Sequence, residues 1–225
     1  MSSFTTKHDE QLQTLVHYQN YPEMLPFIGT NYDSQEKKLL IIGESHYLPK
    51  DTLVDVMKWY EMDSSMLSDD DRDYIWTRNV EWLHDKEKSP FKPIARAISE
   101  TGFNPTHEFN VLEIFKHLAW CNFFQRPAEK TGESINPRQL DREKSEEVLV
   151  HIFETIQPTH VVFVSSKAWD WSEILRDKCK DEPIIFDYAP HPNTRWWNRT
   201  AEKYGNMTGK EKFQNFLKKH KILVP

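Results

Sequence analysis

The chain has 225 residues and a net charge of −6, with 38% hydrophobic, 13% aromatic and 28% charged residues. This length favours a single domain, and this mixture excludes a disordered, collagen-like or membrane-spanning chain. The polar first residues lack the apolar core of a signal peptide, and two cysteines cannot form a disulfide framework. We therefore expect one reduced, cytoplasmic domain over residues 1–225, with no membrane partner.

The first part of the chain predicts one buried strand between two helical regions. Residues 9–24 have weak amphipathic spacing, and residues 38–43 form a continuous apolar run that ends in glycine. Such a run is typical of a parallel strand that is buried on both faces. Residues 50–88 are expected to form an acidic helical insertion, because residues 51–73 contain eight acidic and only two basic residues. The insertion could select an unusual substrate or bind a protein partner.

The rest of the chain alternates apolar runs with helical patterns. A helix with proline near its start is expected at residues 94–98, and a polar loop at residues 126–143. Further strands are expected at residues 118–124, 160–164 and 183–188, and helices at residues 142–156, 168–179 and about 208–222. This alternation predicts a three-layer α/β/α fold with a short, four-stranded, mostly parallel sheet.

The C-terminal part has the opposite charge to the insertion. From residue 195 to the end, the chain contains eight basic and only two acidic residues. Two interpretations stay open: these bases could lie on solvated helix faces, or they could form a basic edge beside a cleft.

Polar residues follow every expected parallel strand, at the end of the sheet where ligands gather. The first strand is followed by residues 43–47, Gly-Glu-Ser-His-Tyr, and residues 121–125, which include Asn122, stand at the end of the second. Residues 165–167 follow the third strand, and residues 190–199 follow the fourth. Alternative interpretations are structural: Glu44 could lie in a tight turn, and Asn122 could cap one. His191 lies between two prolines, which could form a rigid surface turn or hold a catalytic imidazole.

In this combination the chain resembles the uracil-DNA glycosylase superfamily over roughly residues 38–200. That superfamily carries a Gly-Gln-Asp-Pro-Tyr or Gly-Glu-Ala-Pro-Gly turn after its first strand and a His-Pro-Ser turn after its last. Residues 43–47 are similar to the first motif, and His191-Pro192-Asn193 is similar to the second. Asn122 resembles the asparagine that reads the flipped base, and Phe91 resembles the aromatic residue on which the base stacks.

The resemblance implies hydrolysis of the N-glycosidic bond of uracil, or of a modified or damaged base, in DNA. The base would first be flipped out of the stack. His191 would donate a hydrogen bond to the base oxygen as that oxygen becomes anionic, and Glu44 would position or activate the attacking water. Asn122 would pair with the base edge, Phe91 would stack on its face, and Tyr47 would reject thymine. No cofactor and no metal are implied.

Three positions differ from the motifs of the superfamily. Ser45 stands where one branch has its catalytic aspartate, and His46 stands in place of the proline. By position, Ser45 joins the expected catalytic set and His46 the base-binding set. Asn193 replaces the serine of the second motif.

The segment after His191 is expected to contact DNA. Its candidate contacts are Asn193, Arg195, Trp196, Trp197 and Arg199. An aromatic ring can fill the gap left by a flipped base, and guanidinium groups bind phosphate. The alternative for the two tryptophans is packing on the C-terminal helix.

Two other functions stay open. Glu44, His46 and His191 could together supply metal ligands for a metal-assisted hydrolase. A catalytically inactive domain of the same fold could instead bind DNA or a protein, which the loss of aspartate at Ser45 favours.

Overall fold

The computed structural model describes residues 2–80, 89–102 and 109–222, and a five-stranded sheet lies at its centre. The strand order is β1-β3-β2-β4-β5, with β2 to β5 parallel to one another and β1 antiparallel to β3. The strands are β1 (Phe27–Ile28), β2 (Leu39–Gly43), β3 (Ala119–Asn122), β4 (His160–Phe163) and β5 (Ile185–Tyr188). The expected α/β fold with a mostly parallel sheet is confirmed, and the expected count of four strands is corrected to five. The additional strand, β1, has only two residues and lies between Pro26 and Gly29.

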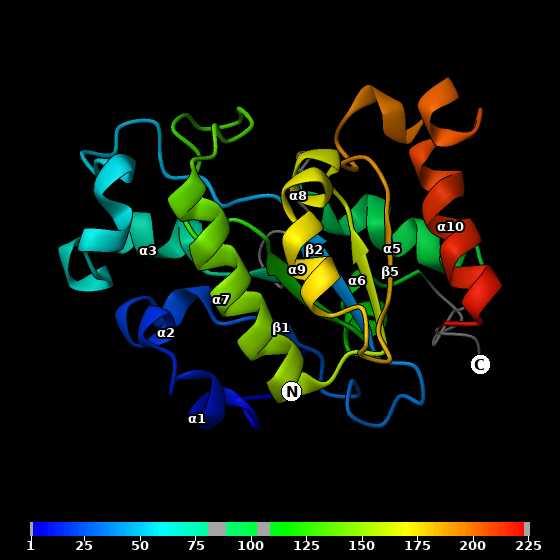
Figure 1. Ribbon diagram of the computed structural model, residues 1–225, viewed down its shortest axis with the longest axis horizontal. Coiled ribbons are helices and arrows are strands. Elements are labelled where there is room, and N and C mark those ends of the chain that lie inside the picture. Colours follow the sequence, from blue (N-terminus) through cyan, green and yellow to red (C-terminus); the bar gives the residue numbers. More distant parts are fainter. Residues whose placement is uncertain (1, 81–88, 103–108, 223–225) are drawn as a thin grey trace.

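Helices cover both faces of the sheet (Figure 1). One face carries α1 (Asp9–Leu12), α2 (Val16–Asn20), α7 (Gln139–Ile156), α8 (Ser166–Trp171) and α9 (Glu173–Lys178). The other face carries α5 (Phe91–Ser99), α6 (Val111–Phe115) and α10 (Gly209–His220). Alternate residues of β2 point to opposite faces: Leu40 and Ile42 join the first core cluster, and Leu39 and Ile41 join the second. The continuous apolar run therefore supplies both cores.

Several helices differ in extent from the expected ones. The helix expected at residues 9–24 consists of α1, α2 and a 3-10 turn, η1 (Pro22–Met24). Gln19 bridges the break between α1 and α2, since its amide donates to the carbonyls of Gln13 and Thr14. The helix expected at residues 168–179 is interrupted at Ser172, whose hydroxyl donates to the Trp169 carbonyl. The α7 helix begins three residues earlier than expected, inside the predicted loop.

The acidic insertion is less helical than expected where the structure describes it. It contains the 3-10 helices η2 (Val56–Glu61) and η3 (Ser64–Met66) and the helix α3 (Asp69–Ile75), whereas residues 81–88 lie outside the described residues. Asp55 and Asp63 each accept a hydrogen bond from the amide two residues later. Such local bonds start new short turns in place of one long helix.

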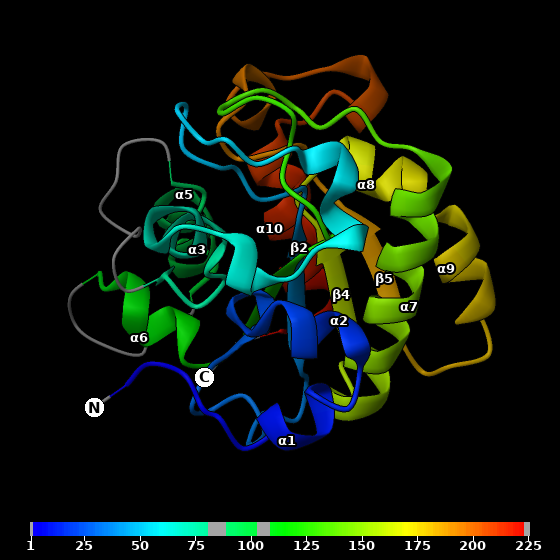
Figure 2. The same cartoon turned by 90° about the vertical axis from the view of Figure 1, so that its left-hand side faces the viewer.

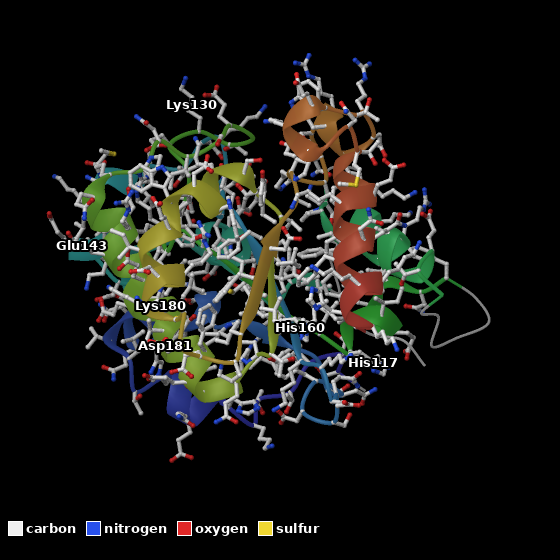
Figure 3. The ribbon with its side chains drawn as sticks, turned by 45° about the vertical axis from the view of Figure 1, so that its right-hand side comes forward. His117, Lys130, Glu143, His160, Lys180 and Asp181 are labelled. Carbon is white, nitrogen blue, oxygen red and sulfur yellow. The ribbon has the colours of Figure 1, made fainter. Side chains whose placement is uncertain are left out.

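The loops at the carboxyl ends of the parallel strands gather at one end of the sheet (Figure 2). They are the segment at residues 44–55 after β2, the β3–α7 loop at residues 123–138, and the segment at residues 189–208 after β5. Lys130 lies on the β3–α7 loop at this end, whereas His117 and His160 lie toward the opposite end (Figure 3). No helix within the described ranges is long and apolar enough to cross a lipid bilayer.

The two edges of the sheet are covered in different ways. At β1, Phe4 pairs with Gly29, and the Thr5 amide donates to the Ile28 carbonyl at 2.8 Å. At β5, the helix α10 sends Lys212 to the strand, where its ammonium donates to Asp187 Oδ1 at 2.6 Å and to the Tyr188 carbonyl at 2.5 Å. Each edge is therefore held by a contact from outside the sheet.

A buried arginine holds the β3–α7 loop against α7. The guanidinium of Arg126 has no exposed surface and donates to Asp141 Oδ1 at 2.8 Å and to Asp141 Oδ2 at 3.1 Å. It also donates to Glu129 and to the carbonyls of Pro127 and Asn136. These bonds join the two ends of the loop to the start of α7, so the loop has one defined path across the end of the sheet.

We expect Arg126→Met to lower the free energy of unfolding by about 3–5 kcal/mol, because the buried Asp141 carboxylate would lose the guanidinium that donates to both of its oxygens. Arg138 would remain, with its amide 2.6 Å and its Nε 3.7 Å from Asp141 Oδ2. Urea unfolding followed by circular dichroism measures this change. Lys144→Met, which breaks the exposed pair with Glu147, is the control and should cost less than about 1 kcal/mol. Equal losses in the two variants would contradict a structural role for the buried pair.

Candidate functional site

Glu44 follows β2 directly, and its carboxylate is held from two sides. Ser165, buried at the end of β4, donates to Glu44 Oε2 at 2.6 Å, and Ser134 of the β3–α7 loop donates to Oε1. Ser165 also caps α8, since its hydroxyl accepts from the Ala168 amide. Each carboxylate oxygen keeps a second lone pair, so the group can still accept a proton from a water. The structure therefore fixes a carboxylate at the carboxyl end of the sheet.

Asn122 ends β3 beside Glu44. It pairs in register with Gly43, and the Phe124 amide donates to the Glu44 carbonyl at 2.9 Å. A Cβ atom at Gly43 would clash with the side-chain oxygen of Asn122 and with the ring of Trp120. A larger residue at this position would therefore displace Asn122 or Trp120, because the amide of Asn122 lies close against the end of β2.

His191 lies in a turn after β5, between the buried residues Pro190 and Pro192. Its Nδ1 accepts a hydrogen bond from the Asn193 amide at 3.2 Å, and its carbonyl accepts from the Thr194 amide at 2.9 Å. A ring nitrogen that accepts carries no hydrogen, so the neutral imidazole has its proton on Nε2. Burial lowers the pKa of His191, and the negative charge of Glu44 partly opposes this shift. The ring is therefore a neutral hydrogen-bond donor whose charge state responds to Glu44.

The two residues before Leu48 lie in different surroundings. Tyr47 is 36% exposed, and burial together with the charge of Glu44 raises the pKa of its hydroxyl. His46 is buried with Nε2 3.2 Å from Thr77 Oγ1, and burial lowers its pKa to about 4. Tyr47 therefore lies at the site surface near Glu44, whereas His46 is a neutral side chain in contact with Thr77.

Ser45 lies between Glu44 and His46 in the sequence, and its hydroxyl is buried. Within the described residues its Oγ has no hydrogen-bond partner. A buried hydroxyl without a partner has lost its hydrogen bonds to water, which costs free energy unless a bound group restores them.

Two predicted site aromatics belong to the core of the layer that contains α5 and α10. Phe91 is 5% exposed and lies edge-on to Phe115 and Trp120, with ring centroids 5.4 and 5.2 Å away. Trp197 is 2% exposed and lies 5.8 Å from the ring of Phe213 on α10. In this conformation both rings are covered by protein, and Trp197 makes the packing contact that was the alternative to a wedge. The base-stacking role of Phe91 stays a prediction.

The other predicted DNA contacts lie on the surface of the segment after His191. This segment forms the short turns η4 (Arg195–Trp197) and η5 (Glu202–Tyr204). Arg195 and Arg199 are exposed, and the Arg195 guanidinium lies 4.4 Å from the ring centre of Trp196. Asn193 is also exposed, and its backbone amide holds the His191 ring. The segment thus combines exposed cations with a partly exposed indole.

The two serines that bind Glu44 (Ser134 and Ser165) were not among the residues expected to form the site. The sequence could have indicated Ser165, because a residue that directly follows an apolar strand lies at the carboxyl end of the sheet. No sequence feature indicates Ser134, which is 90 positions from Glu44. The loop path that brings it there depends on the buried Arg126.

The structure does not bring together the three residues of the alternative metal site, Glu44, His46 and His191. His46 contacts Thr77, whereas Glu44 contacts Ser134 and Ser165. Among the residues that the structure describes, no group of three His, Cys, Asp or Glu side chains is placed to hold a metal ion.

Comparison with models of protein families and with curated proteins finds no match to this chain. The structure brings Glu44, Asn122, Tyr47 and His191 to the same end of the sheet.

We expect nuclear magnetic resonance titration to give a pKa for His191 below 6.5, with the proton of the neutral ring on Nε2. Glu44→Gln should lower this pKa further, because the carboxylate stabilises the imidazolium. The signals are assigned by their loss in His191→Ala, and Glu154→Gln on the exposed face of α7 is the control. A rise of the His191 pKa in Glu44→Gln would contradict the proximity of the two groups.

Proposed function

We propose that this protein hydrolyses the N-glycosidic bond of uracil or of a modified or damaged base in DNA, after flipping the base out of the stack. The observation that carries the proposal is a fixed carboxylate, Glu44, at the same end of the sheet as a neutral imidazole that can donate through Nε2, His191. This combination suits a reaction in which a base leaves as an anion and water replaces it.

The reaction needs one group at each end of the breaking bond. As the bond between the sugar C1′ and the base nitrogen breaks, its electron pair moves to the base and positive charge develops on the sugar. His191 Nε2–H donates to a base oxygen and stabilises the developing anion. Glu44 stabilises the positive sugar and accepts a proton from the water that attacks C1′. The products are the free base and an abasic sugar, and the proton taken from the water restores the neutral base.

In this proposal, Asn122 and Tyr47, which lie near Glu44, recognise the base. The amide of Asn122 offers both a donor and an acceptor, which can pair with the edge of a base. Its close contact with Gly43 restricts its orientation, as the proposal requires of a recognition group. Tyr47, partly exposed near Glu44, would limit the size of the substituent that the base can carry.

The segment after His191 would hold the DNA backbone. Arg195 and Arg199 are exposed cations, and Trp196 adds a partly exposed aromatic surface. Guanidinium groups bind phosphate, and indole rings stack on bases or fill a gap in the stack.

A second candidate is a DNA- or protein-binding domain of the same fold without catalysis. Ser45 favours it, because a hydroxyl cannot act as a general base at neutral pH without activation. The two candidates differ in whether a base is released.

The first test is a base-release assay with labelled single- and double-stranded DNA that carries uracil, hypoxanthine or hypermodified pyrimidines, followed by alkaline cleavage of abasic sites. His191→Ala should reduce release by about 10²–10³-fold, and Glu44→Gln by about 10²–10⁴-fold. His151→Ala, which removes an imidazole from α7, should retain the rate. Release that survives in His191→Ala, or wild-type protein that binds DNA and releases no base, would contradict the catalytic proposal.

The proposed backbone contacts predict salt-dependent DNA binding. Arg195→Gln and Arg199→Gln should each weaken binding to all sequences and reduce the slope of log K against log salt by about 1, because each lost phosphate contact releases one counterion fewer. Fluorescence anisotropy at several salt concentrations measures the slope. Lys180→Gln, at an exposed lysine on the loop before β5, is the control (Figure 3). An unchanged slope in both arginine variants would show that DNA phosphates do not contact Arg195 or Arg199.

A further inference from the structure

The acidic insertion contains an open groove that the proposed reaction does not use. Its volume is about 600 Å³, and we call it the insertion groove. Its apolar lining residues are Pro49, Leu53, Val54, Met62 and Met66. The groove begins two residues after Tyr47, and Thr131 of the β3–α7 loop donates to the Leu48 carbonyl at 2.6 Å. The groove is therefore close in sequence to the segment that carries Glu44 and Tyr47, and the β3–α7 loop contacts that segment.

The apolar walls of the groove are unusually exposed. Leu53 is fully exposed and Met66 is 65% exposed, which are the two highest values among the large hydrophobic side chains that the structure describes. Val54 and Met62, in contrast, pack against the core. Exposed apolar surface at a groove marks an interaction site, and methionine adapts its shape to a partner.

The rim of the groove is negatively charged. Asp51, Asp55 and Asp70 line it and are exposed. Asp71 belongs to the wall, because it is buried and accepts hydrogen bonds from Thr52 and Ser68. Negative charge repels DNA phosphates and attracts lysine and arginine. The occupant must therefore combine positive charge with apolar side chains.

We propose that the insertion groove binds a basic, amphipathic segment of another protein. Its apolar side chains would cover Leu53 and Met66, and its lysines or arginines would lie beside Asp51, Asp55 and Asp70. This inference is independent of the proposed glycosidic reaction, since none of these residues belongs to the candidate active site.

A second copy of this chain fits the groove less well. Its C-terminal segment has the required positive charge, but the apolar side of α10 is buried in its own core through Phe213, Phe216 and Leu217. The α10 helix offers the groove charge without apolar surface. Within one molecule, α3 and α10 lie at opposite ends of the longest axis, so the helix does not fill its own groove (Figure 1).

The test uses three fluorescent 14-residue peptides and measures binding by anisotropy. The first combines leucine and lysine at helical spacing, the second replaces every leucine with glutamine, and the third replaces every lysine with glutamate. We expect only the first to bind tightly. Binding of the glutamine–lysine peptide with equal affinity would overturn the proposal, because charge alone would then explain it, and so would failure of the leucine–lysine peptide to bind.

Variants of the groove separate its apolar and charged contributions. Leu53→Ser with Met66→Gln should weaken binding of the leucine–lysine peptide about tenfold or more, because buried apolar area is lost. Asp51→Asn, Asp55→Asn and Asp70→Asn together should weaken it and reduce its salt dependence. Val16→Ser and Glu154→Gln change an exposed apolar and an exposed acidic residue elsewhere and should have no effect. Unchanged affinity in the groove variants would overturn the proposal.

Sedimentation of the protein without peptide tests whether a second copy of the chain occupies the groove. We expect the wild-type protein and the groove variants to have the same sedimentation coefficient. Self-association that is lost in Leu53→Ser with Met66→Gln would assign the groove to a second copy and overturn the proposal of a different partner.

Discussion

The parallel register of β2 with its two neighbours determines where Glu44, Asn122 and Ser165 lie. Gly43 pairs with Asn122 on one side, and Ile42 pairs with Phe163 on the other. Because paired strands of similar length end at the same level, Glu44, Asn122 and Ser165 emerge together. The alternation of β2 side chains between two cores fixes this register, since a slip by one residue would exchange the two faces. The packing of the core thus positions the polar groups at its end.

The site also depends on a long loop whose path is set by a buried ion pair. Arg126 and Asp141 are both inaccessible to solvent, and the arginine satisfies carbonyls at both ends of the β3–α7 loop. This arrangement brings Ser134 to Glu44 and lets Lys167 of α8 donate to the Ile135 carbonyl. The carboxylate is therefore held by residues from two loops, each of which is fixed by contacts in a different part of the fold.

The sequence predicted the parts of this structure that depend on local pattern. The apolar runs at β2, β4 and β5 and the polar residues that follow them led to the α/β fold and to the placement of Glu44 and His191 after parallel strands. Local pattern failed where tertiary contacts decide the outcome. The strand β1 is two residues long and exists through pairing with β3, and the helix break at Ser172 depends on side-chain hydrogen bonds. The burial of Phe91 follows from its contacts with Phe115 and Trp120, residues that the sequence places more than twenty positions away.

The contact between Lys212 and β5 has a consequence for the behaviour of the protein in concentrated solution. Within the described residues β5 is an outer strand of the sheet, and a strand at an edge can pair with the same strand of another molecule. The ammonium group of Lys212 donates to Asp187 and to the Tyr188 carbonyl. This carbonyl is a group near the edge that could otherwise accept a hydrogen bond from a second molecule. Two molecules that approached along β5 would bring two such ammonium groups together and would have to displace them. At the other edge, β1 is too short to template a partner. The fold thereby opposes growth of its sheet into aggregates.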